Sequence, residues 1–146
     1  MALQFTGRDV ALTRTAANRR FDFVFSTSGP NKGNPVLDDT RTHAVLTTLL
    51  SWKRGTRPGA RVPEGGYYWD TVGRRGTLLW TVSQDRLTTL SQLEAFAQDG
   101  GQQLIDAQQI ASFTARAQRV GPGRFRLNVT WSNPSGVPQS PLGISL

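Results

Sequence analysis

The chain has no cysteine among its 146 residues. This absence excludes a disulfide framework and any metal site built on thiolates. Histidine is almost as scarce, because His43 is the only one in the sequence. A zinc site would have to rely on carboxylates, so we expect a surface or helix-capping role for His43 and no bound metal.

Long apolar stretches are also missing. No run approaches the roughly 20 residues that a membrane span requires, so we expect no association with a membrane. The first ten residues lack the basic start and apolar stretch of a signal peptide. The sequence therefore indicates an intracellular or intravirion protein, and its length indicates one domain with a sizeable core.

Patterns of catalytic residues are absent as well. Glycoside hydrolysis needs two carboxylates that flank the scissile bond, and the sequence has only two glutamates, Glu64 and Glu94. Glu64 falls in a loop, and we expect Glu94 to face solvent on a helix. Neither a phosphate-binding loop nor a nucleophile elbow occurs. We therefore expect a protein that is not an enzyme and that uses no cofactor.

Positive charge is abundant and consists almost entirely of arginine. The net charge is +7, and only two of the 17 basic residues are lysines. The arginine guanidinium suits carboxylates, phosphates and aromatic faces, and a basic chain can bind nucleic acid. The arginines are nevertheless spread from Arg8 to Arg126, with no run longer than two. This spread favours a solvated surface with subunit contacts, and nucleic-acid binding remains the alternative.

Alternating apolar residues predict strands in the first part of the chain. A small hairpin is expected over residues 3–12, with a turn at 7–9. Three phenylalanines at alternate positions predict a clearer strand at 20–26. Glycine, proline and asparagine mark residues 28–35 as a loop.

Helical spacing of apolar residues predicts a first main helix that ends near Trp52. Its cap is expected at Asp38, Asp39 or Thr40. The apolar stripe of this helix consists of Val45, Leu46, Leu49 and Leu50. A short helix is expected to follow at about 77–83.

The longest helix is expected to start at Thr88 or Thr89 and to end near Asp106. Thr89 and Gln92 fit a capping box. Its buried stripe consists of Leu90, Leu93, Ala97, Leu104 and Ile105. Gly100 and Gly101 interrupt this helix, and each costs about 1 kcal/mol relative to alanine. Because the stripe resumes in phase after them, we expect the helix to continue and a neighbouring backbone to pack closely there.

A hairpin is predicted near the end of the chain. Apolar residues occupy odd positions in both halves, from Phe113 and from Phe125 onward. Both sets reach the same face only if the numbers of paired residues sum to an even number. A three-residue loop at 121–123 meets this condition and pairs Val120 with Arg124 and Phe113 with Trp131. The opposite face then carries Arg116, Arg124 and Arg126.

The last segment, residues 134–146, contains three prolines and no periodicity. We expect an extended tail that is ordered only where a partner holds it. Residues 1–133 then form a single domain of the α+β class. Its predicted architecture is a mostly antiparallel sheet with two main helices packed on one face and a C-terminal β-hairpin.

The segment from Arg57 to Leu93 carries the most distinctive residues. A loop rich in glycine and proline contains Tyr67, Tyr68 and Trp69, and a Gly-Arg-Arg-Gly hinge at 73–76 follows. Large aromatic side chains bury about 150–250 Å² each, so this loop is expected to pack on the domain or on a partner. Trp69 is the candidate structural anchor. The candidate partner interface consists of Tyr67, Tyr68, Arg74, Arg75, Arg116, Arg124 and Arg126.

Several stretches together resemble a known family. They are VLDDTRTHAVLTTLLSWKRGTRPG (36–59), GGYYWD (65–70), GTLLWTV (76–82), LSQLEAFAQDGGQQLID (90–106) and ASFTARAQRVGPGRFRLNVTW (111–131). In order and spacing they are similar to the small baseplate wedge, or sheath initiator, family of contractile phage tails, in the branch of phage Mu. The similarity covers nearly the whole chain through short motifs.

The resemblance implies a structural part of the virion, assembled in the host cytoplasm and present in multiple copies around the tail axis of the baseplate. Implied partners are the larger baseplate wedge proteins and the tail sheath protein, with central spike or hub proteins as further candidates. The implied mechanism is strand addition, in which a partner's terminal arm completes an unpaired sheet edge. The predicted hairpin and tail would supply the parts. The alternative is a basic nucleic-acid-binding or head–tail joining protein, in which the arginines would form one continuous stripe.

Overall fold

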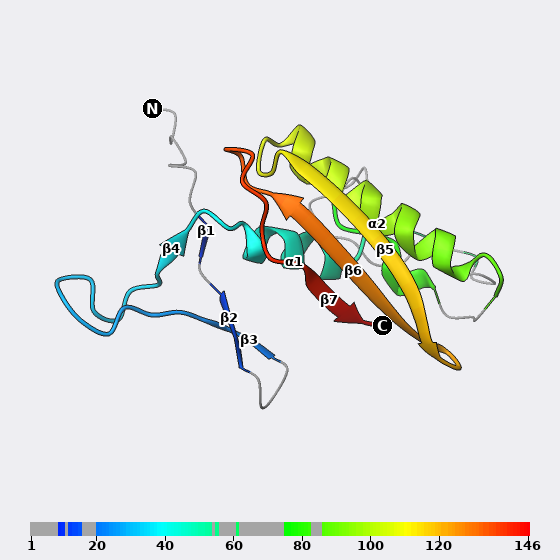
Figure 1. Cartoon of the computed structure of the whole chain (residues 1–146), viewed down its shortest axis with the longest axis horizontal. Coiled ribbons are helices and arrows are strands. Elements are labelled where there is room, and N and C mark those ends of the chain that lie inside the picture. Colours follow the sequence, from blue (N-terminus) through cyan, green and yellow to red (C-terminus); the bar gives the residue numbers. More distant parts are fainter. Residues whose placement is uncertain are drawn as a thin grey trace.

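The structure is a computed structural model that describes residues 9–10, 12–15, 20–53, 55, 61, 75–82 and 86–146. Its elements in chain order are β1 (Asp9–Val10), β2 (Leu12–Thr15), β3 (Arg20–Phe23), β4 (Leu37–Asp38), α1 (Thr42–Leu50), the 3₁₀ helix η1 (Leu79–Thr81), α2 (Thr89–Asp106), β5 (Ser112–Gly121), β6 (Arg124–Ser132) and β7 (Leu142–Ser145). Two helices pack with a three-stranded antiparallel sheet, which confirms the predicted α+β class (Figure 1).

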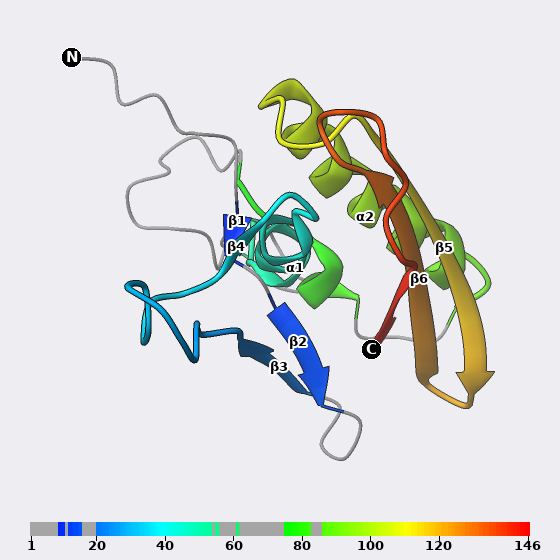
Figure 2. The same ribbon diagram turned by 60° about the vertical axis from the view of Figure 1, so that its left-hand side comes forward.

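The core lies between the sheet of β5, β6 and β7 and the two α-helices. Odd-numbered residues point inward along β6 and along β5 as far as Ala117, and Leu127 and Val129 are completely buried. They meet Val45 and Leu49 of α1 and Leu93 of α2, among others, in one cluster. Both helices therefore cover the same face of the sheet, as Figure 2 shows from the side. The predicted stripes are confirmed except that Leu50 is 55% exposed and that Leu90 and Ile105 are only partly buried against the core.

The β5–β6 hairpin confirms the predicted pairing of Phe113 with Trp131 and corrects its turn. The tip pairs Gly121 with Arg124, and the register shifts between Arg119 and Gly121. The predicted pair of Val120 with Arg124 is therefore wrong. A two-residue turn alone would have placed the apolar sets on opposite faces, but the extra residue of the bulge restores them to one face.

The C-terminal segment folds back on the sheet. Strand β7 pairs antiparallel with β6, matching Val129 with Leu142 and Arg126 with Ser145. Leu142 is buried in the core. The expectation that this tail needs a partner to become ordered is wrong for residues 142–145, because the chain's own β6 supplies the hydrogen-bonding edge and the core accepts the leucine.

Helix α2 runs without a break through Gly100 and Gly101 to Asp106, as predicted. The close neighbours of the two glycines are side chains, not the predicted backbone. A Cβ at Gly100 would lie 2.6 Å from Thr77 Cγ2, and one at Gly101 would overlap the ring of Phe113. The predicted capping box does not form, because Thr88 is the N-cap and Thr89 Oγ1 accepts a hydrogen bond from Arg86 N–H at 2.8 Å.

The start of α1 also differs from the prediction. Its N-cap is Arg41, a buried residue with a φ of +62°, and Asp38 belongs to strand β4. Thr40 comes nearest to the predicted cap, since its Oγ1 lies 3.4 Å from the Thr42 nitrogen. Trp131 Nε1 donates to Thr40 O at 2.7 Å and so holds the helix start against β6.

The first part of the chain forms two small antiparallel pairs, β1 with β4 and β2 with β3. Asp9 was predicted in a turn, but it lies in β1 and pairs with Asp38 of β4, because a segment distant in the sequence supplies the partner strand. Residues 3–8 of the predicted hairpin lie outside the described residues. The predicted strand at 20–26 is present over its first four residues, as β3. Residues 24–36 then extend away from the helices and the large sheet (Figure 1), and we call residues 20–38 the N-terminal arm. In the described part of the chain, no helix is long and apolar enough to cross a membrane.

Candidate partner interface

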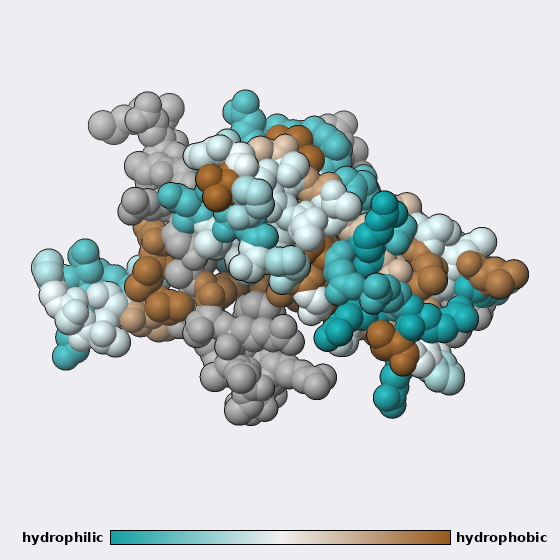
Figure 3. Space-filling view, in the orientation of Figure 1, coloured by the Kyte–Doolittle hydropathy of each residue, from teal (hydrophilic) through white to brown (hydrophobic). Residues whose placement is uncertain are grey.

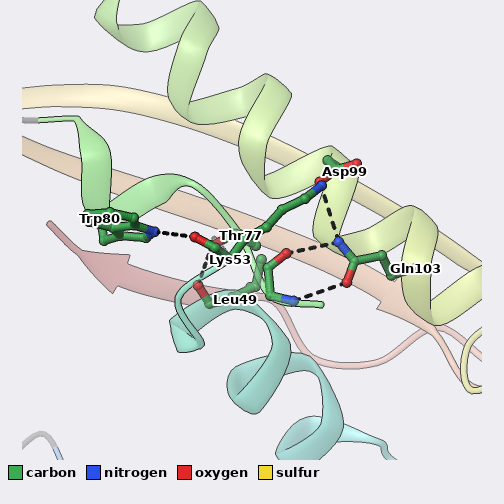
Figure 4. A network of polar contacts seen from close by, with 7 residues as sticks. Leu49, Lys53, Thr77, Trp80, Asp99 and Gln103 are labelled. Atoms are coloured by element: carbon green, nitrogen blue, oxygen red, sulfur yellow. Dashed lines mark hydrogen bonds and ion pairs between the residues drawn. The ribbon is translucent and has the colours of Figure 1, made fainter. Parts of the chain in front are cut away.

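A network of polar contacts joins the two ends of the aromatic loop (Figure 4). Thr77 N–H donates to Ser51 O and Lys53 N–H donates to Thr77 O, both at 2.9 Å. The Thr77 hydroxyl donates to Leu49 O at 2.8 Å. Residues 51–53 and 76–77 thus lie side by side, at the base of the loop. We call this network, completed by Trp80, Asp99 and Gln103, the loop-base clamp.

Helix α2 and a pair of tryptophans complete the loop-base clamp. Lys53 Nζ lies 2.7 Å from Asp99 Oδ2. Gln103 donates to Gly76 O at 2.9 Å and accepts from Gly76 N–H at 3.2 Å. Trp80 Nε1 donates to Lys53 O at 2.9 Å, while its ring stacks on Trp52 with centroids 5.3 Å apart. The clamp therefore fixes where the aromatic loop leaves and rejoins the domain.

The predicted interface residues of this loop are only partly visible. Tyr67, Tyr68, Trp69 and Arg74 lie outside the described residues. Arg75 is exposed and borders a cleft of about 760 Å³, which residues of α1 and α2 also line, such as Thr47 and Gln103. The loop-base clamp itself was missed by the sequence reasoning, because nothing in the sequence relates Lys53 to Asp99 or Gly76 to Gln103.

The outer face of the sheet brings together the other three predicted interface residues. Arg116, Arg124 and Arg126 are all exposed, while their neighbours in the strands, such as Phe125 and Leu127, are buried. This arrangement confirms that the three arginines share the face opposite the apolar one. We call these three residues the arginine face. Figure 3 shows hydrophilic residues gathered over the half of the sheet that leads to the hairpin tip.

Acidic side chains are absent from the sequence that builds this sheet. Residues 107–146 contain four arginines and no aspartate, glutamate, lysine or histidine. Arg116 Nη1 lies 3.7 Å from Glu94 Oε2, and the Arg116 side chain is 75% exposed, so the ion pair is weak. Among the described residues, Arg124 and Arg126 have no carboxylate within ion-pair distance. The arginine face is thus a small positive surface with little internal compensation.

The arginines that the structure describes do not form one stripe. Arg75 lies on the side of the helices, whereas the arginine face lies on the opposite side of the sheet. Arg19 and Arg74 are outside the described residues, and only the backbone of Arg20 is described.

The free edge of β5 is covered by side chains of α2. Glu94 Oε1 accepts a hydrogen bond from Ala117 N–H at 2.9 Å. Gln98 Nε2 donates to Phe113 O at 3.1 Å. The expectation that Glu94 faces solvent is therefore wrong: its carboxylate lies at the sheet edge. Their spacing of four residues places Glu94 and Gln98 on one helix face, but it does not indicate that this face meets a strand edge.

The edge of β7 is open in the described part of the chain. Phe125 and Leu146 exchange two backbone hydrogen bonds, of 3.2 and 2.9 Å. Because bonded and non-bonded pairs alternate in an antiparallel ladder, Gly143 and Ser145 direct their N–H and C=O groups away from β6. No described strand pairs on that side.

His43 is half-buried on α1, and no group of three histidine or acidic side chains that could hold a metal ion occurs within the described ranges. Glu64 lies outside the described residues.

No family model, no curated protein and no solved structure matches this chain.

Proposed function

We propose that the protein is a structural component of a contractile phage tail baseplate, where it joins wedge subunits and templates the first sheath ring. The partners are the larger wedge proteins and the tail sheath protein, in the virion, around the tail axis. No catalysis, cofactor or nucleic acid takes part. The proposal rests on the motif order in the sequence and on a sheet with one closed and one open edge.

The open edge of β7 is the observation that supports strand addition most directly. The unpaired N–H and C=O groups of Gly143 and Ser145 can bond an incoming strand. The opposite edge, at β5, already bonds to Glu94 and Gln98. The chain's own tail forms β7, so the added strand comes from the partner.

The N-terminal arm offers a second contact for neighbouring subunits. Its backbone is held by pairs such as Ser26 N–H to Asn34 O at 2.9 Å and Val36 N–H to Val24 O at 2.7 Å. Phe25 on the arm is 52% exposed. A large apolar side chain at half exposure gains free energy when a partner covers it.

The test is a pull-down of the protein with tail sheath and baseplate wedge proteins, followed by electron microscopy of the assembled particle. Ser145→Pro removes one outward N–H group from β7 and should abolish the pull-down, whereas Ser145→Ala should keep it. Prolines at Arg116 or Arg126 are unsuitable, because the register turns those N–H groups toward the neighbouring strand of the hairpin.

The proposal fails if no tail protein is retained. The nucleic-acid or head–tail joining alternative would be favoured if the protein bound duplex DNA with a submicromolar Kd and if this affinity fell about 10³–10⁵-fold between about 50 and 200 mM salt.

A further inference from the structure

The arginine face has a regular spacing along the hairpin. Arg124 and Arg126 are two residues apart on β6, so their side chains leave the sheet about 7 Å apart. Arg126 pairs with Gln118 and Asn128 pairs with Arg116. Arg116 is therefore the diagonal neighbour of Arg126 across the ladder, again about 7–8 Å away. The points at which the three side chains leave the sheet therefore follow one another at intervals of about 7–8 Å, from Arg124 to Arg126 on β6 and on to Arg116 on β5. From these points Arg126 reaches toward Gly143 of β7 and Arg116 toward Glu94.

An extended peptide has the same repeat. Side chains on one side of a strand recur at every second residue, about 7 Å apart. Acidic residues at alternating positions of a peptide can therefore meet the arginines one to one. Each guanidinium offers a planar fork of donors that a carboxylate accepts in pairs.

The rest of the face suits a peptide better than a nucleic acid. The outward residues between and beside the arginines are small or amide side chains, among them Thr114, Gln118 and Asn128. The aromatic residues of β5 and β6, Phe113, Phe125 and Trp131, are all buried on the other face. Surfaces that bind single-stranded nucleic acid stack bases on exposed aromatics, and the outward positions of these strands carry none.

The three arginines also repel one another. The Glu94 carboxylate contacts only Arg116 and is engaged by Ala117 N–H. An acidic partner would relieve this repulsion without having to displace a strong internal ion pair.

We infer that the outer face of the β5–β6 hairpin binds an extended acidic segment of a partner protein, with carboxylates at alternating positions on Arg124, Arg126 and Arg116. This inference rests on the proposed function only for the source of the segment, a neighbouring virion subunit. The contact differs from strand addition because it uses side chains on the sheet face and leaves the β7 edge unoccupied.

The experiment measures binding by the fluorescence anisotropy of a labelled peptide. The peptide has about ten residues, in which five glutamates alternate with threonines. A second peptide has the same composition with the glutamates in one block. Wild-type protein should bind the alternating peptide at least about threefold more tightly than the block peptide. The triple variant Arg116→Gln/Arg124→Gln/Arg126→Gln should lose about tenfold or more in affinity.

The matched control is Lys32→Gln/Arg61→Gln/Arg86→Gln, which removes the same charge from exposed positions elsewhere. It should change the affinity less than about threefold, since its positions are not on the arginine face. Thermal unfolding of both triple variants checks that they fold. The peptide affinity of the single variant Arg124→Gln tests the contribution of the arginine nearest the hairpin tip.

Three results would overturn the inference. They are no saturable binding of the alternating peptide, equal losses in the two triples, and tighter binding of a DNA oligonucleotide that only the arginine-face triple abolishes. The last result would assign the face to nucleic acid. Because the test uses peptides alone, it can succeed or fail independently of the pull-down with tail proteins.

Discussion

The ring of Phe113 on β5 occupies the space that a Cβ atom at Gly101 on α2 would fill. Helix and strand approach so closely here that only a residue without a side chain fits. Phe113 is buried and pairs with Trp131 in the adjacent strand. The cost of glycine in a helix is therefore offset by close packing between α2 and the sheet.

We predict that Gly101→Ala destabilises the protein by roughly 1–3 kcal/mol, the range for overpacked cores. At a helix position without close neighbours, glycine to alanine would stabilise the protein by about 1 kcal/mol. The sign of the change in unfolding free energy therefore distinguishes a close approach from an open position. Chemical denaturation of the single variant and of Gly101→Ala/Phe113→Leu measures the effect. The smaller leucine should recover part of the loss that the alanine causes. A single variant as stable as wild type would contradict the close approach.

The cover of the β5 edge leads to a second prediction. Glu94→Ala/Gln98→Ala should leave Ala117 N–H and Phe113 C=O without partners and so expose a strand edge that other copies can pair with. Sedimentation velocity should then show concentration-dependent self-association. The control Ser91→Ala/Gln92→Ala changes two exposed positions of the same helix and should remain like wild type. An unchanged sedimentation profile in the first variant would show that the two side chains do not protect the edge.

The loop-base clamp leads to a third prediction, which compares two adjacent glutamines. Gln103→Ala removes both hydrogen bonds to the Gly76 backbone and should cost roughly 1–2 kcal/mol. Gln102→Ala removes only an exposed contact with Asp106 and should cost less than about 0.5 kcal/mol.

Limited trypsin digestion provides a second measurement of the clamp. Gln103→Ala should speed cleavage at the arginines of residues 54–75, because opening the base of the loop requires less free energy. Equal cleavage rates in the two glutamine variants would argue against a clamp at Gln103.

The sequence by itself determined the elements whose evidence is local. Apolar spacing located α1 and α2, and odd-numbered apolar residues placed Arg116, Arg124 and Arg126 on the outer face of the hairpin. The in-phase stripe on both sides of Gly100 and Gly101 showed that α2 continues through them. These features depend on the periods of helix and strand, which neighbouring residues reveal without knowledge of the partner.

The tertiary structure decided what lies opposite each element. A bulge at the tip changed the pairing of Arg124, and β6 drew the Pro-rich tail into the sheet as β7. The fold brings the Glu94 carboxylate to the edge of β5 and pairs Lys53 with Asp99, 46 residues away. Such contacts join groups that are distant in the sequence, and their free energy depends on packing that forms only when the whole core does. For this reason the open edge at β7 and the closed edge at β5, which matter most for the proposed function, could not be read from the residues alone.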